Sequence, residues 1–128
     1  MFDLLTDFFR ERELFPLVLL YGSAAKESFG RHSDVDIAVA GSTALDRVLL
    51  YSTRAELSVL LGREIDLIDL YRAEGLILYK VMTGSKRVKL DAALFVKNKR
   101  KALRYKEDFK PIQDKLRNAR IRRFVYGS

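Results

Sequence analysis

The sequence predicts an α/β fold in which a single small β-sheet is flanked by helices. Short apolar runs of strand length alternate along the chain with longer stretches of helical periodicity, as expected for this class. The 128 residues are the usual length of one domain, and 48% of them are apolar, enough for one core. We therefore expect one domain over 1–128, with a core over about 15–95 and a C-terminal helical segment over about 91–126.

The first part of the chain is expected to form a helix, a strand, a short helix and a second strand. Apolar residues at helical spacing predict a helix over 2–13. The unbroken apolar run 17–21 predicts a buried strand, which ends at Gly22. A short helix over 24–29 and a strand over 35–40 follow.

The middle of the chain is expected to hold a long helix and a third strand. Thr43 as N-cap, with Asp46 three residues later, resembles a capping box, so a helix is expected from there to about Leu61. Gly62 suits the left-handed position that often follows a helix end. The run 64–70 then predicts the third strand.

The remainder is expected to be mainly helical. A helix is expected over 72–83 and a short edge strand over 87–90. Asp91 is placed to cap the long basic helix that follows. Pro111 predicts a kink or break near Lys110, because an interior proline costs a helix ~3 kcal/mol or more.

The net charge of +7 is concentrated near the C-terminus. Residues 97–123 hold twelve lysines and arginines against three acids, a net of +9. Such asymmetry indicates an acidic protein surface or RNA as partner, and its other interpretation is a solvated helix face. The aromatic residues between these charges suit packing better than base stacking, so nucleic acid is not the favoured partner.

Several classes of protein are excluded or disfavoured by composition. There is no cysteine and His32 is the only histidine, which excludes thiolate sites and zinc sites built from several histidines. No secretory signal and no apolar run long enough for a bilayer is visible, so a soluble, cytoplasmic protein is expected. His32 itself is interpreted as an ordinary loop residue.

Two carboxylates stand at the entry to the second strand. Asp34 and Asp36 are two residues apart, so an extended backbone places them on one face while Val35 and Ile37 point into the core. Neighbouring carboxylates repel each other unless a cation lies between them, and hard oxygen ligands suit Mg²⁺ or Mn²⁺. The pair therefore predicts a divalent metal site.

The Gly22-Ser23 pair, ten residues before Asp34, is placed to bind phosphate. Glycine lets the backbone approach a ligand closely, and N–H groups at a helix start attract anions. The Ser23 hydroxyl adds a donor, and Lys26 adds positive charge one turn later. Taken alone, Ser23 also fits a plain helix N-cap.

The third strand supplies a third acid, Asp66, between apolar residues. A buried charge needs a partner, so Asp66 is expected to complete a three-carboxylate cage with Asp34 and Asp36. Asp69, nearer the strand end, is the other candidate and is expected instead to cap the following helix. A phosphate cradle beside carboxylate-bound metals suits in-line displacement at phosphorus, and Asp66 is placed to take the proton of the attacking oxygen.

The pattern of Gly22-Ser23, a ten-residue gap and Asp34-Val35-Asp36 resembles the signature of the polymerase-β nucleotidyltransferase superfamily. The short length and the run 66–70 are similar to its minimal nucleotidyltransferase (MNT) domains, over about 15–95. The resemblance implies a polymerase-β-like fold with a single small mixed sheet. One departure is Lys26, where many relatives have an arginine followed by glycine, and it concerns the phosphate loop rather than the metal site.

The resemblance also implies an activity. Members of this group are often antitoxins that transfer AMP from ATP to a tyrosine of a HEPN-domain ribonuclease toxin. Carried over by position, Gly22 and Ser23 would contact the triphosphate, Asp34 and Asp36 would bind two Mg²⁺ ions, and Asp66 would bind the catalytic ion.

Three functions remain open from the sequence. The first is AMP transfer to a partner protein, because a chain of this length has little room for a separate substrate domain. The second is a binding antitoxin that acts mainly by complex formation with a toxin or RNA through 97–123. The third, and least favoured, is a small-molecule nucleotidyltransferase acting on an antibiotic.

Overall fold

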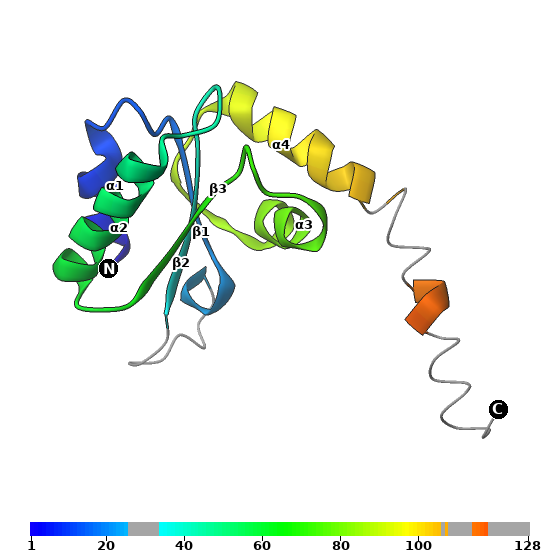
Figure 1. The fold of residues 1–128 in the computed structure, drawn as a ribbon, viewed down its shortest axis with the longest axis horizontal. Helices are drawn as coiled ribbons and strands as arrows, with labels where there is room; N and C mark the ends of the chain where they lie inside the picture. The colour runs from blue at the N-terminus through cyan, green and yellow to red at the C-terminus, as the bar shows by residue number, and fades with distance from the viewer. Residues whose placement is uncertain (26–33, 106, 108–113, 118–128) are drawn as a thin grey trace, which may run out of the picture.

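The computed structural model describes residues 1–25, 34–105, 107 and 114–117. Within them, a four-stranded sheet separates two layers of helices (Figure 1). In chain order the elements are α1 (Phe2–Arg10), β1 (Leu17–Tyr21), the 3-10 helix η1 (Gly22–Ala25), β2 (Val35–Ala40), α2 (Arg47–Leu61), β3 (Ile65–Asp69), α3 (Gly75–Gly84), β4 (Lys86–Lys89) and α4 (Ala92–Arg104). The α/β fold class is therefore confirmed.

The sheet is mixed and has the strand order β3-β2-β1-β4. β1 pairs antiparallel with β2 and with β4, whereas β2 pairs parallel with β3. β1 lies in the interior of the sheet and is buried along its whole length, in agreement with its unbroken apolar run. β3 and β4 are the edge strands, so the edge position predicted near 87–90 is confirmed.

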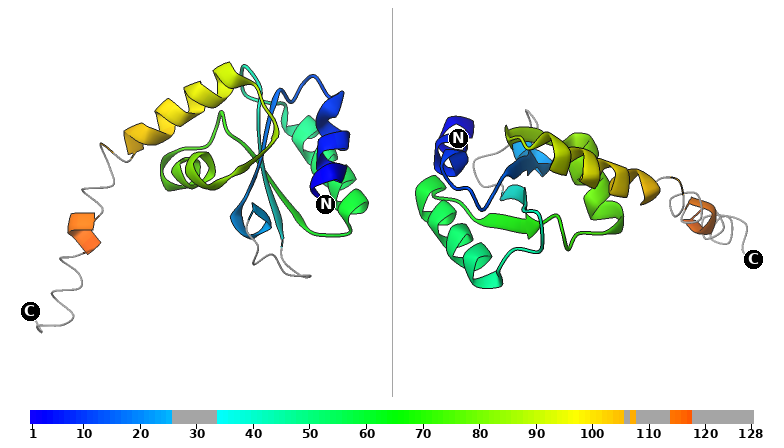
Figure 2. Two further views of the ribbon diagram at one scale, coloured as in Figure 1. Left: turned by 180° about the vertical axis from the view of Figure 1, so that it is seen from behind. Right: turned by 90° about the horizontal axis from the view of Figure 1, so that it is seen from above.

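Two apolar clusters fill the two faces of the sheet. α1 and α2 cover one face, and α3 and α4 cover the other, as Figures 1 and 2 show. On β2, Val35 and Ile37 belong to the cluster under α1 and α2, whereas Ala38 belongs to the cluster under α3 and α4. Because alternate strand residues share a face, Asp36 lies on the α3 side of the sheet.

The start of α2 differs from the prediction. Asp46, not Thr43, is its N-cap, and the Asp46 carboxylate accepts hydrogen bonds from two N–H groups of the first turn. The capping box at Thr43 is wrong because the Leu45 N–H donates to Asp69 Oδ2 at 2.9 Å, which holds this segment outside the helix. At the other end, Gly62 has a φ of 62°, so the predicted left-handed helix end is confirmed.

The start of α3 is also later than predicted. The carbonyl of Asp69 accepts the N–H groups of Arg72 and Ala73, both at 3.1 Å, and this turn delays the helix to Gly75. The cap of α4 agrees with expectation, since Asp91 accepts the Leu94 N–H at 3.0 Å.

Tyr105 packs as the sequence indicated, buried with its ring centroid 5.8 Å from that of Tyr79. Of the short helix predicted over 24–29, residues 24 and 25 belong to the 3-10 helix η1, which begins at Gly22, and residues 26–29 lie outside the described residues. Lys26, His32 and Pro111 lie outside the described residues. None of the helices in the described ranges is long and apolar enough to span a lipid bilayer.

Candidate active site

The predicted acids lie at the end of the sheet where β1 finishes and β2 and β3 begin. Tyr21 of β1 is opposite Asp36 of β2, and Asp36 is in turn opposite Asp66 of β3. Residues paired across strands point to the same face, so these three form one row on the α3 side. Asp34 directly precedes β2 and shares that face with Asp36 by alternation. The fold thus brings together the three acids predicted from the sequence, Asp34, Asp36 and Asp66, which we call the acid row.

The exposure of these acids differs from expectation at one position. Asp34 and Asp66 are exposed, whereas Asp36 is partly buried. The burial predicted for Asp66 is wrong, because β3 is an edge strand and the Asp66 side chain reaches solvent. An exposed carboxylate at the sheet edge is accessible both to a metal ion and to an incoming reactant.

Electrostatic repulsion links the members of the row. Burial, followed by the charges of Asp66 and Asp34, raises the pKa of Asp36 above its ordinary value. Burial and the charges of Asp66 and Asp36 likewise raise the pKa of Tyr21, so its hydroxyl keeps its proton at neutral pH. A divalent cation would offset the repulsion among the carboxylates, and their hard oxygen atoms fit Mg²⁺ or Mn²⁺.

The carboxylates form a row rather than the closed cage expected from the sequence. Among the described residues, no three acidic or histidine side chains are close enough to hold an ion by themselves. Mg²⁺ at nucleotide sites usually takes one or two carboxylates and completes its shell with water and substrate phosphates. The row therefore fits metal ions that bind together with a phosphorylated substrate.

Gly22 joins this row to the start of η1. Its φ is +67°, in the left-handed region, and a Cβ built on it would overlap Asp36 Oδ2. Any other residue at this position would strain the backbone and displace the carboxylate. Ser23 lies inside η1 rather than in front of it, so it is not a plain N-cap. A phosphate held by the backbone of η1 would therefore lie beside Asp36.

Asp69 has a structural role. It is 6% exposed, and its carboxylate accepts the N–H groups of Leu45 and Tyr71 and the guanidinium of Arg72, at 2.9, 3.0 and 2.9 Å. The prediction that Asp69 caps α3 is wrong. Its carboxylate instead connects the end of β3 to the loop before α2. It is opposite Val39, three positions along β3 from Asp66, and so lies away from the acid row.

Sequence reasoning missed one residue at the site and one farther along β3. Tyr21 was assigned only to a strand, although its position next to Gly22 places it opposite the acids once β1 and β2 pair antiparallel. Arg47 lies beside the outer edge of β3. No local pattern announces Arg47, because its position depends on how α2 packs against the sheet.

The family model described as "Polymerase beta, Nucleotidyltransferase" matches residues 4–92. Over 72 residues, the chain is 32% identical to "Protein adenylyltransferase MntA" of Shewanella oneidensis. That match covers 56% of this chain and 52% of MntA, so it spans about half the length of the relative.

Solved structures with the same fold include two toxin–antitoxin complexes. A chain of "the toxin-antitoxin with AMP-PNP" superimposes with a TM-score of 0.79 at 21% identity, covering 94% of this chain and 98% of that chain. A chain of the "tri-AMPylated Shewanella oneidensis HEPN toxin in complex with MNT antitoxin" gives 0.73 at 20% identity, with 94% and 99% covered. At these identities the similarity establishes the fold.

Proposed function

Because the chain belongs to the polymerase β nucleotidyltransferase family, we propose that it is an antitoxin that transfers AMP from ATP to a tyrosine of a HEPN-type ribonuclease toxin. The observation that carries this proposal is the acid row of Asp36 and Asp66, with Asp36 packed against Gly22 at the start of η1. Carboxylates for metal ions and backbone for phosphates are thereby adjacent. The similarity to a protein adenylyltransferase, and to an MNT antitoxin bound to an AMPylated HEPN toxin, supports the choice of substrates.

The residues divide the work of binding ATP. The backbone at Gly22 and the Ser23 hydroxyl hold the triphosphate, and the carboxylates of Asp34 and Asp36 hold two Mg²⁺ ions, with Asp66 on the side of the acceptor. When bound, the ions supply charge neutralisation for the attacking and leaving oxygens. Lys26, which lies outside the described residues, remains a predicted phosphate contact.

The reaction is a displacement at the α-phosphorus of ATP. The tyrosine oxygen forms a new bond to that phosphorus, the bond to the bridging oxygen of the β-phosphate breaks, and pyrophosphate leaves. The phenolic proton passes to Asp66, directly or through water. Asp66 suits this role because its exposed carboxylate lies on the edge strand, where a protein acceptor has access.

The test compares ATP labelled on the α-phosphate with ATP labelled on the γ-phosphate. Each is incubated with Mg²⁺, the purified chain and a HEPN-type toxin encoded in the same genome. The proposal predicts that only the α-label enters the toxin and that Asp36→Asn abolishes it. Glu64→Gln is the matched control, because Glu64 is also exposed and precedes β3 but lies outside the row.

Other outcomes distinguish the alternatives. Incorporation of the γ-label would show phosphoryl transfer and contradict the proposal. A stable complex without either label would indicate an antitoxin that acts by binding alone. Label on an aminoglycoside in the absence of toxin would instead favour a small-molecule acceptor.

A further inference from the structure

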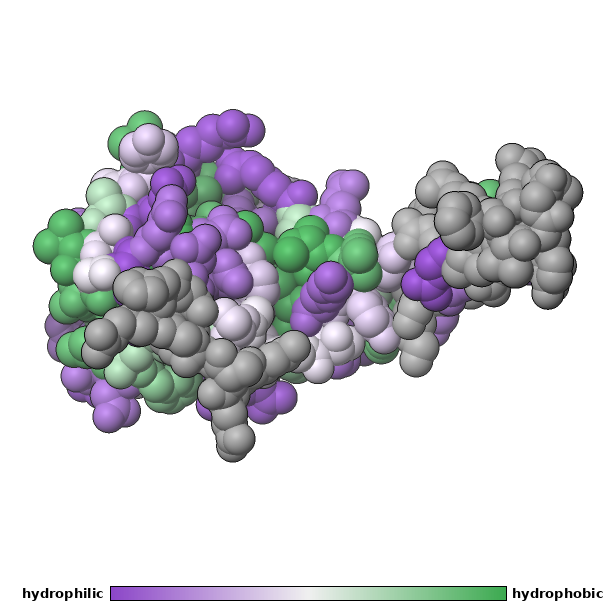
Figure 3. All heavy atoms as spheres, turned by 90° about the horizontal axis from the view of Figure 1, so that it is seen from below, coloured by the Kyte–Doolittle hydropathy of each residue, from purple (hydrophilic) through white to green (hydrophobic). Residues whose placement is uncertain are grey.

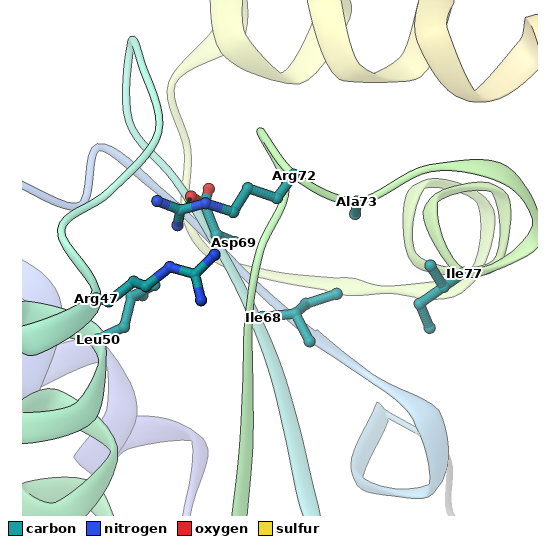
Figure 4. Close-up of a pocket in the computed structure, with 7 residues that line it drawn as sticks. All are labelled: Arg47, Leu50, Ile68, Asp69, Arg72, Ala73 and Ile77. Carbon is teal, nitrogen blue, oxygen red and sulfur yellow. Dashed lines mark hydrogen bonds and ion pairs between the residues drawn. The ribbon is translucent and has the colours of Figure 1, made fainter.

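A groove runs along the outer side of β3, between α2 and α3. Its volume is about 370 Å³, and Figure 4 shows β3 passing between Arg47 and Leu50 on one side and Ile77 on the other. We call it the β3 groove. The lining residue nearest to Asp66 along β3 is Ile68, two residues away and on the same face of the sheet.

The outer edge of β3 carries backbone groups that β2 does not use. β3 pairs only with β2 in the described sheet. The Glu64 carbonyl accepts from β2 at 3.0 Å and the Leu70 N–H donates to β2 at 2.8 Å, so the even-numbered residues of this stretch bond to β2. In a parallel ladder the residues between them turn their N–H and C=O groups the other way. Ile65 and Leu67 therefore turn theirs to the outer edge. Ile65 is only 3% exposed, so the partly exposed Leu67 offers the accessible backbone there.

One end of the groove is positively charged. Arg47 is exposed and forms no ion pair with any residue in the described part of the chain. Arg72 binds Asp69 at 2.9 Å, but that carboxylate is shared with the N–H groups of Leu45 and Tyr71. Two guanidinium groups thus face one carboxylate that is already occupied. Arginine pairs are well suited to a further carboxylate, which they bind with directed hydrogen bonds.

The walls of the groove are apolar. Ile68 and Ile77 point toward the space between β3 and α3 in Figure 4. α3 leaves Leu76 and Ile77 47% and 42% exposed, and Figure 3 shows apolar surface gathered over this helix. An extended segment with alternating apolar and acidic side chains would match both the walls and the charged end.

We infer that the β3 groove binds an extended, acidic segment of the acceptor protein, which lies along the outer edge of β3. Its backbone pairs with Leu67, and its carboxylate binds Arg47 and Arg72. The inference rests on the proposed function, because it assumes a protein acceptor. Three strand positions separate Asp66 from Asp69, which is ~10 Å at ~3.3 Å per residue. The acidic residue of the segment therefore lies about three residues from the accepting tyrosine.

Charge reversal at Arg47 tests the charged end. Arg47→Glu and the matched control Arg54→Glu change the same charge on α2, and both side chains are exposed. Toxin binding is measured by calorimetry, and AMP transfer by steady-state kinetics. We expect Arg47→Glu to raise both the Kd and the KM for toxin about tenfold, with kcat and the affinity for ATP nearly unchanged. Arg54→Glu is expected to behave as the unmodified chain does.

Two further measurements test the geometry. In hydrogen–deuterium exchange, toxin binding should slow exchange of the amide of Leu67. A toxin in which an acid about three residues from the modified tyrosine is replaced by arginine should regain affinity for the Arg47→Glu variant.

The outcomes separate this inference from the proposed function. If the toxin is modified normally by Arg47→Glu and the amide of Leu67 gains no protection, the groove is not the docking site and the proposed function stands. If the toxin protects the Leu67 amide and binding depends on Arg47, but no AMP is transferred, the docking site stands and the proposed chemistry fails. If the unmodified chain neither binds nor labels the toxin, both fail.

Discussion

Replacing Gly22 with alanine separates the cost of backbone strain from the loss of the site. Gly22 has a φ of +67°, and a Cβ there would overlap Asp36 Oδ2. The left-handed conformation alone costs a non-glycine residue ~1–2 kcal/mol. For a domain of this size we expect the melting temperature to fall by about 3–6 °C for each kcal/mol.

The effect on catalysis should be much larger than the effect on stability. Relief of the overlap requires the Asp36 carboxylate or the start of η1 to move, and a displacement near 1 Å at a catalytic group can lower the rate about 100-fold. Gly62→Ala is the matched control, because Gly62 has a φ of +62° but a Cβ added there would meet nothing within 4 Å. It should lose similar stability and keep its activity.

The assay measures AMP transfer to the toxin at a temperature where the unmodified chain and both glycine variants are folded. Thermal unfolding of the same three proteins is followed by circular dichroism. Equal activity in Gly22→Ala and Gly62→Ala, at equal loss of stability, would refute the reasoning. It would show that contact between Gly22 and Asp36 is not needed for the reaction.

Three other predictions concern the acids. Asp36→Asn should raise the melting temperature of the metal-free protein at neutral pH, because it removes a partly buried charge next to Asp66 and Asp34. Solvent screening should keep the gain in stability below ~1 kcal/mol. A lower melting temperature would contradict the proposed repulsion. Because the pKa of Asp36 is raised, its contribution to the stability of the metal-free protein is fully present below the ordinary carboxylate pKa and is lost as pH rises through the raised value. The affinity for Mg²⁺, measured by calorimetry, should increase over the same rise in pH. An affinity independent of pH would contradict the raised pKa of Asp36. Asp69→Ala should lower the free energy of unfolding in urea by ~2–3 kcal/mol, because the buried Leu45 N–H loses its acceptor. Asp66→Ala should change it by less than ~0.5 kcal/mol. Equal losses would contradict the structural role of Asp69 and the site role of Asp66.

The local patterns of the sequence predicted most of the fold and the residues of the acid row. The buried run of β1 and the alternation of Asp34, Val35, Asp36 and Ile37 depend on near neighbours, and both are seen in the structure. Asp91 and Gly62 were also identified correctly, because helix caps depend on the local sequence at the helix ends.

The predictions that failed depend on contacts between distant parts of the chain. The start of α2 moved from Thr43 to Asp46 because Leu45 bonds to Asp69, 24 residues away. The burial predicted for Asp66 was wrong because the sequence of a strand does not determine its position in the sheet, and β3 lies at an edge. Arg47 and the β3 groove were not predicted for the same reason, because the groove is formed by three separate elements.

The central claim is that Asp34, Asp36 and Asp66 direct AMP onto a protein acceptor. The most direct measurement is the intact mass of a HEPN-type toxin from the same genome after incubation with the chain, ATP and Mg²⁺, followed by fragmentation to locate the change. We predict a mass increase of one or more AMP groups on tyrosine, which is absent with Asp36→Asn and retained with Glu64→Gln. An unchanged toxin mass, or an increase that persists in Asp36→Asn, would contradict the claim.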